Sequence, residues 1–177
     1  MGAKGRQVRV VLDTNVVVSA LLHGGPTARF QTLWRRGILV PWVSQEMLDE
    51  YVRVLNYPKF GYSPELVVEV LNEALFPWLR RAKPWQGRLA HPPKDKDDER
   101  FLRAALGANA EALVSGDPHL TSLDGKYPFP IQTPRAFLER GLFRQDGSIG
   151  ETRAVFGTKP RKRSSRKTRR VVAKRTS

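Results

Sequence analysis

Cysteine is absent from the 177-residue chain, and histidine and methionine are scarce, with three and two residues. The absence of cysteine excludes a disulfide scaffold and a thiolate zinc site, and it fits a reducing compartment such as the cytoplasm. No apolar run approaches the roughly 20 residues that a transmembrane helix needs, and the start, MGAKGRQ, lacks the shape of a signal peptide. We therefore expect a soluble, cytoplasmic protein without membrane contact, built from one domain and an appendage.

Acidic residues are few beside basic ones, with 17 Asp and Glu against 31 Lys and Arg and a net charge of +14. The excess is uneven, because residues 157–177 contain ten Lys or Arg and no acid, which leaves 21 basic and 17 acidic residues in 1–156. The periodicity of apolar residues fades from about residue 143. We therefore predict a domain of residues 1–142 and a disordered basic tail of residues 143–177.

Short apolar strands alternate with amphipathic helices along the first 141 residues. The predicted strands are 7–12, 38–42, 111–114 and 129–133. The predicted helices are 14–22, 26–36, 45–55, 63–82 with Pro77 kinking or ending it, 95–106, 117–123 and 133–141. This alternation predicts an α/β fold with a mostly parallel central sheet that helices cover on both faces.

Acidic side chains follow the ends of the predicted strands. Asp13 comes directly after the first strand, Asp117 follows the strand at 111–114, and Asp49 and Glu50 flank the apolar stripe of the helix after the second strand. Ligand sites of parallel sheets lie outside the carboxyl ends of the strands, so these acids can converge. Clustered carboxylates repel one another unless a cation joins them, and a hard divalent ion such as Mg or Mn suits oxygen ligands.

Three further acids, Asp95, Asp97 and Asp98, open the next helix. Each acid could merely cap a helix, as Asp98 and Asp117 are well placed to do, and Asp13 could equally cap the helix at 14–22. We keep the capping interpretation for Asp95 and Asp97. For four acids at one end of a sheet we favour a metal site, which would activate a water and stabilise charge on a phosphate. The pattern thus indicates metal-dependent phosphodiester hydrolysis.

Four stretches in order, VVLDTNVVVSALL, SQEMLDEYVRVL, DKDDERFLRAAL and ALVSGDPHL, resemble the PIN-domain nucleases, in particular the VapC-related toxin branch of toxin–antitoxin systems. The closing PIQTPRAFLER is also similar, so the resemblance covers roughly residues 8–140. It implies a PIN-like three-layer fold. The family's four acids correspond to Asp13, Glu50, Asp98 and Asp117, which would hold one or two Mg or Mn ions. The resemblance thereby selects Glu50 over Asp49 and Asp98 over Asp97.

The resemblance also implies the residues beside the acids and the activity. Asn15 corresponds to a polar residue that supports the first acid, and Thr14 and Ser115 complete their motifs. The implied activity is cleavage of single-stranded RNA, inhibited by a cognate antitoxin, and the resemblance suggests a homodimer. Attack by a metal-activated water should leave a 3′-hydroxyl and a 5′-phosphate. The long basic tail departs from the compact toxins of this branch.

Two other functions stay open: a non-catalytic RNA-binding module whose acids only cap helices, and a housekeeping RNA-processing or DNA-repair nuclease of the same fold. Tail cations would contact phosphates without reading sequence, although the tail could also be a solubilising extension. The tail residues that we expect to bind RNA are Lys159, Arg161, Lys162, Arg163, Arg166, Lys167, Arg169 and Arg170.

Several single residues outside the acids are candidates for contact with RNA. Trp85 lies in a predicted loop and could stack on a base, whereas Trp34 and Trp42 sit in apolar patterns that favour the core. His119 is two positions after Asp117 and could line the site. The adjacent arginines 80 and 81 are predicted to end a helix, where cations suit the helix dipole, and they could also guide RNA.

Overall fold

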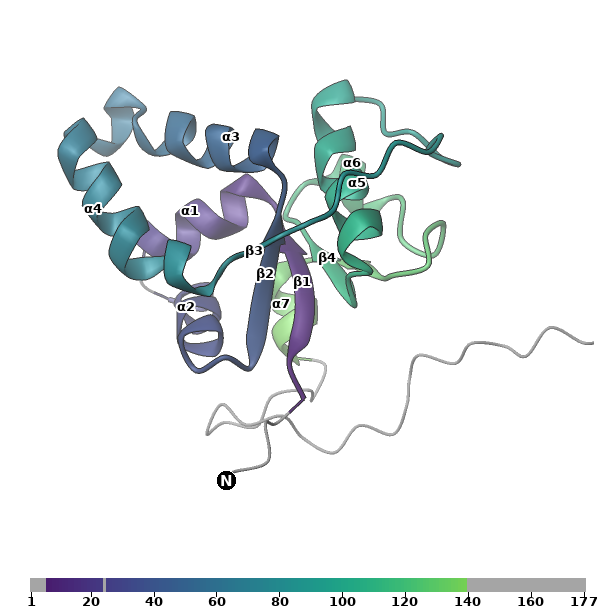
Figure 1. Cartoon of the computed structure of the whole chain (residues 1–177), viewed down its shortest axis with the longest axis horizontal. Coiled ribbons are helices and arrows are strands. Elements are labelled where there is room, and N and C mark those ends of the chain that lie inside the picture. The colour runs from purple at the N-terminus through teal and green to yellow at the C-terminus, as the bar shows by residue number, and fades with distance from the viewer. Residues whose placement is uncertain (1–5, 24, 140–177) are drawn as a thin grey trace, which may run out of the picture.

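Five parallel strands form the centre of the molecule (Figure 1), in a computed structural model that describes residues 6–23 and 25–139. Their order across the sheet is β3-β2-β1-β4-β5. The strands are β1 (Val8–Leu12), β2 (Leu39–Val43), β3 (Arg80–Arg81), β4 (Ala112–Val114) and β5 (Ile131–Gln132). The helices are α1 (Thr14–Leu22), α2 (Ala28–Arg35), α3 (Gln45–Leu55), α4 (Pro64–Ala74), α5 (Glu99–Ala108), α6 (Pro118–Thr121) and α7 (Pro134–Glu139), with short 3-10 turns η1 (Pro58–Phe60), η2 (Phe76–Trp78) and η3 (Lys96–Asp98).

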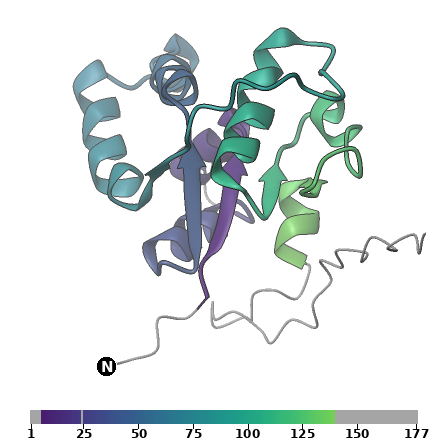
Figure 2. The same cartoon turned by 45° about the vertical axis from the view of Figure 1, so that its right-hand side comes forward.

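Helices cover both faces of this sheet. α5 packs against β1, β2 and β4, and Figure 2 shows α5 in front of the strands with α1 behind them. On the face opposite α5, α2 contacts α1, and its Phe30 stacks on Phe137 of α7 with 5.8 Å between ring centroids. The structure confirms the predicted three-layer α/β fold.

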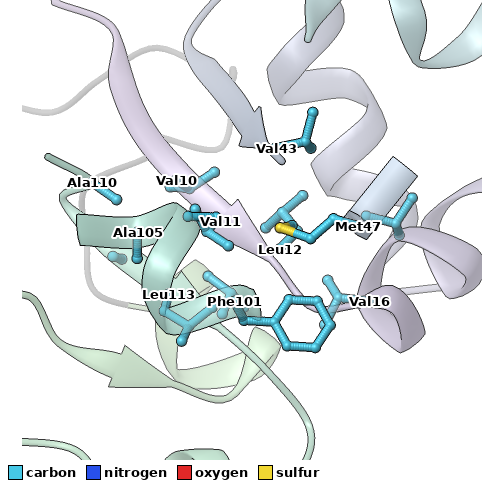
Figure 3. Packing of buried hydrophobic residues seen from close by; sticks show 14 of the residues in the cluster. Val10, Val11, Leu12, Val16, Val43, Met47, Phe101, Ala105, Ala110 and Leu113 are labelled. Atoms are coloured by element: carbon cyan, nitrogen blue, oxygen red, sulfur yellow. The ribbon is translucent and has the colours of Figure 1, made fainter. Parts of the chain in front are cut away.

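The central strands are buried on both faces, which explains their nearly continuous apolar sequence. Val10, Val11 and Leu12 of β1 are at most 1% exposed. Figure 3 shows these side chains packed close to Phe101 of α5 and Met47 of α3. Because β1 is buried on both faces, its position in the sheet is fixed. The position of Asp13, which follows Leu12, is thereby fixed as well.

Serine caps begin the two helices that follow β2. The side chain of Ser44 accepts a hydrogen bond from the backbone N–H of Met47, and the side chain of Ser63 accepts one from Leu66, both at 3.3 Å. Each cap satisfies a backbone donor that would otherwise lack a partner in the first turn of its helix. Both helix starts agree with the apolar periodicity.

The segment after α4 differs from the prediction. The helix predicted over 63–82 ends at Ala74, and Pro77 lies in η2, because proline cannot donate the hydrogen bond that would continue a helix. The prediction that Arg80 and Arg81 end a helix is wrong. They form β3 and pair with Trp42 and Val43 of β2.

Two further boundaries need comment. Pro26 precedes α2 in a turn instead of occupying its first turn, since α2 begins at Ala28. The predicted boundary after residue 142 and the tail 143–177 lie outside the described residues. Within the described part of the chain, no helix combines the length and apolar character needed to cross a membrane.

Candidate functional site

The carboxyl ends of β1 and β4 meet at the point where the chain changes direction across the sheet. After β1, the strands β2 and β3 add on one side, and β4 and β5 add on the other. Ligands of open parallel sheets bind at such switch points. The backbone N–H of Asp13 donates to the carbonyl of Val114 at 2.9 Å, so the residues that follow the two strands lie side by side.

Asp13 is a buried carboxylate at this point, with 4% of its surface exposed. Its Oδ2 accepts a hydrogen bond from Ser115 Oγ at 2.6 Å, and its Oδ1 accepts one from the backbone N–H of Asn15 at 3.1 Å, which caps α1. Burial raises the pKa of Asp13, the two hydrogen bonds oppose that rise, and the charges of Asp117 and Glu50 add to it. The sequence thus places an acid where its ionised form is costly.

Ser115 joins Asp13 to the loop that carries Asp117. The Ser115 hydroxyl is fully buried, donates to Asp13 and accepts from the backbone N–H of Asp117 at 2.9 Å. The Asp117 carboxylate accepts from the backbone N–H of His119 at 2.7 Å and so caps α6. One small side chain therefore sets the spacing of two acids that are far apart in the sequence.

Glu50 faces the same region from α3. Its Oε1 accepts from Thr14 Oγ1 at 3.3 Å, and its Oε2 pairs with Nη1 of Arg100. The next residue, Tyr51, donates its hydroxyl to the carbonyl of Leu12 at 2.6 Å, which ties α3 to the end of β1. These contacts place the Glu50 side chain, which is 16% exposed, over the carboxyl edge of the sheet.

Asp98 lies at the start of α5 and carries the most unusual carboxylate of the cluster. Its side chain makes no capping hydrogen bond, and its Oδ2 is buried without a hydrogen-bond partner among the described residues. Burial raises the pKa of Asp98 to about 6, with further contributions from the charges of Asp117, Asp95 and Asp13, while His119 opposes the rise. A half-buried acid that has one buried oxygen without a partner and lies beside other acids is characteristic of functional sites.

The four predicted acids therefore lie in one region, at the carboxyl edge of the sheet, although their side chains do not converge on a single point. The charges of Asp117 and Glu50 contribute to the raised pKa of Asp13, and those of Asp117 and Asp13 contribute to the raised pKa of Asp98. Capping explains the places of Asp13 and Asp117, but neither Glu50 nor Asp98 caps a helix. Helix capping alone does not account for the cluster.

The neighbouring acids have structural roles. Asp95 accepts from the backbone N–H of Asp97 at 2.9 Å and caps η3, so the capping interpretation of Asp95 agrees with the structure. Asp97 does not cap; its side chain is 80% exposed and pairs with Arg100 at 3.1 Å.

The residues beside the acids largely take the predicted places. Asn15 supports Asp13, as expected, through its backbone N–H, and the hydroxyl of Thr14 donates to Glu50. Arg100 was missed, because the sequence around α5 gives no sign that separates it from Arg103. The imidazole of His119 lies close enough to the cluster to act on the pKa of Asp98.

The donor set fits a hard divalent cation, since all four acids offer oxygen ligands and Asp98 offers a buried oxygen without a partner. As the side chains stand, no three acidic or histidine side chains of the described residues are grouped closely enough to hold an ion. Glu50 is turned toward Arg100 and Asp13 toward Ser115. A cation would have to compete with these two contacts.

An α/β fold with acids at the switch point of a parallel sheet is an arrangement that suits metal-dependent hydrolysis. Residues 9–119 match the PIN domain family, and this range includes all four acids. The chain belongs to the PIN domain family, whose members are generally nucleases that use divalent metal ions. No curated protein matches the chain.

Proposed function

We propose that the protein is a Mg- or Mn-dependent endoribonuclease that cleaves single-stranded RNA, acting as the toxin of a toxin–antitoxin pair in the cytoplasm. The observation that carries the catalytic part is the buried, unpaired Oδ2 of Asp98 beside Asp13 and Asp117. Removing an ionised carboxylate from water is costly unless a positive charge compensates it. A divalent cation among these acids would supply that charge.

Asp13, Glu50, Asp98 and Asp117 are the residues that would hold the ions. When bound, a divalent cation supplies an activated water and stabilises the negative charge that develops on the scissile phosphate. Ser115 holds the carboxylate of Asp13 in one orientation, and Thr14 holds Oε1 of Glu50, while Arg100 occupies Oε2 of Glu50, where it would compete with the cation. The buried ends of β1 and β4 exclude solvent from one wall of the site. Hydrolysis by water should leave a 3′-hydroxyl and a 5′-phosphate.

An apolar surface supports the proposed partners, an antitoxin and a second copy of the chain. Four large apolar residues of α3 and α4 are buried in the core and are not available to a partner: Tyr51, Leu55, Val67 and Leu71. Among the described residues, the exposed large apolar side chains fall within one segment, 52–76, at Val52, Tyr57, Tyr62, Leu66, Val68 and Phe76. This segment is where we expect a protein partner to bind, provided that these side chains form a continuous patch.

The catalytic proposal is tested with labelled single-stranded RNA in the presence of Mn and in EDTA. Glu50→Gln and Asp13→Asn should abolish cleavage while retaining the fold. Asp49→Asn is the matched control, because Asp49 is the exposed neighbour of Glu50 on α3 and its carboxylate accepts only from Gln45 Nε2, at 2.7 Å, among the described contacts. RNA binding without metal-dependent cleavage in any condition would instead support a non-catalytic binding module.

The basic tail favours a second candidate, a housekeeping RNA-processing or DNA-repair nuclease of the same fold. The ten Lys or Arg of residues 157–177 add a charged segment that compact toxins of this branch lack. Expression in a bacterial host separates the two candidates, because a toxin should arrest growth through an intact Asp13 and a housekeeping enzyme should not. Deleting residues 157–177 should lower RNA affinity and its dependence on salt, while cleavage chemistry persists.

A further inference from the structure

A hollow of about 500 Å³ lies beside the acid cluster, between the start of α3, the segment that follows β3, and α5. This volume is within the range of ordinary ligand pockets. We call the hollow the Trp85 groove. Its lining includes Val43, Arg81, Lys83, Trp85, Arg100 and Arg103.

The Trp85 groove carries two cations that are not committed to acids. Arg103 pairs with Glu99 at 2.9 Å. Arg81 donates to the side-chain amide of Gln45, and Lys83 is exposed, and neither forms an ion pair with an acid of the described residues. These two side chains are therefore free to neutralise the charges of an anionic ligand.

Trp85 is held in place beside these cations. Arg103 Nη1 donates to the carbonyls of Trp85 and Gly87, at 3.4 and 3.1 Å, and its guanidinium lies 5.9 Å from the ring centroid. The ring covers Gly87 so closely that a Cβ there would come within 2.6 Å of it. Because the ring is partly exposed and already ordered, stacking on it would cost little conformational entropy.

The segment that follows β3 and carries Trp85 contacts α5 at a second point, besides the hydrogen bonds from Arg103. The carbonyl of Lys83 would lie 2.0 Å from a Cβ added to Gly107, so the close approach of the two backbones requires glycine at this position. Arg100 then connects the groove to the acids, because it lines the groove and also pairs with Glu50.

We propose that the Trp85 groove binds a single-stranded nucleic acid, with Arg81 and Lys83 contacting its phosphates and Trp85 stacking on an unpaired base. The strand would then continue past Arg100 to the acid cluster. A base can stack on an exposed aromatic ring only when it is free of a duplex, so the groove selects single strands. The biological role of this groove rests on the proposed nuclease function. Its binding of nucleic acid can nevertheless be measured in the absence of cleavage.

The test measures binding of a labelled single-stranded RNA to the full chain in EDTA, by fluorescence anisotropy over a range of salt concentrations. Arg81→Ala with Lys83→Ala should lower the affinity and reduce the slope of log affinity against log salt by about 1.4, since each phosphate contact to a single strand contributes roughly 0.7. Trp85→Leu should weaken binding about tenfold, with the slope unchanged. Trp85→Phe should restore most of the loss.

The matched control is Arg29→Ala with Lys126→Ala, which removes the same charge from two exposed residues outside the groove. Groove variants that bind like the wild type, or a control pair that lowers the slope as much as the groove pair, would overturn the assignment. Equal loss of binding to a duplex of the same sequence would also overturn it, because stacking on Trp85 needs an unpaired base. Circular dichroism of each variant shows that the fold is kept.

Failure of the groove and failure of the proposed function give different results. If the wild type shows no metal-dependent cleavage but the groove variants lose binding, the groove stands and the nuclease proposal fails. If Mn-dependent cleavage occurs and the groove variants bind and cleave normally, the nuclease proposal stands and the groove fails.

Discussion

Replacing Ser115 by alanine should destabilise the metal-free protein, because its hydroxyl is the side-chain donor to the buried carboxylate of Asp13. Hydrogen bonds to charged groups contribute about 1.5–3 kcal/mol to the free energy of unfolding. The same hydroxyl also accepts from the backbone N–H of Asp117, which loses its partner in the variant. We expect a loss of about 2–3 kcal/mol, which corresponds to a fall in melting temperature of roughly 6–9 °C for a chain of this size.

The assay is thermal unfolding followed by circular dichroism, in EDTA. Ser115→Cys separates hydrogen bonding from cavity formation, since a thiol is somewhat larger than the hydroxyl, leaves no cavity and donates weakly. The control is Ser122→Ala, which removes an exposed hydroxyl that donates to the carbonyl of His119 at 2.8 Å and should change the melting temperature by less than about 2 °C. A Ser115→Ala variant as stable as the control would refute the role given to this hydroxyl.

The pH dependence of the same variant gives a second readout. The hydrogen bond from Ser115 lowers the pKa of Asp13, so its removal should raise that pKa further. An acid whose pKa is raised on folding stabilises the protein below its unfolded pKa and loses that contribution as the pH rises through the folded value. The difference between wild type and Ser115→Ala should therefore widen as the pH rises from below the unfolded pKa of Asp13 through its folded pKa, and level off above it; a difference that stays constant across this titration would contradict the reasoning.

Three further predictions concern Asp98, Arg100 and Gly107. Because the pKa of Asp98 is raised from 3.8 to about 6, its contribution to stability in EDTA should grow as the pH falls through about 6, and melting curves of Asp98→Asn should lack this gain. Arg100→Met should lower the melting temperature in EDTA but raise Mn affinity by calorimetry, since Glu50 then keeps only the exposed Arg53, at 3.7 Å, as a cation that competes with the metal; lower Mn affinity would contradict this. Gly107→Ala should cost more than about 1 kcal/mol in urea unfolding, because the new methyl group meets the carbonyl of Lys83, and unchanged stability would show that the segment yields easily.

The positions of three of the four acids could be predicted, because these acids lie next to strands or helices that the local sequence pattern indicates. Asp13 and Asp117 directly follow or nearly follow apolar strands, and Asp98 immediately precedes an amphipathic helix. The parallel arrangement then brings the ends of strands to one edge. Glu50 was harder, since Asp49 has the same chemistry on the same helix, and the resemblance to the PIN family was needed to choose between them.

The sequence by itself determined where α1, α3 and α4 begin and that β1 is buried on both faces. Asp13, Ser44 and Ser63 cap α1, α3 and α4 through hydrogen bonds that span two or three residues, and the valines of β1 require burial on both faces. Such signals are local, so they can be read from neighbouring residues.

Only the tertiary structure decided which groups meet at the acids. Ser115 reaches Asp13 across 102 positions, and Arg100 reaches Glu50 across 50. β3 is equally non-local, because its two residues become a strand only when the edge of β2 is there to pair with them. A hydrogen bond between distant residues depends on the packing of whole layers, and that packing leaves no mark in the sequence around either partner.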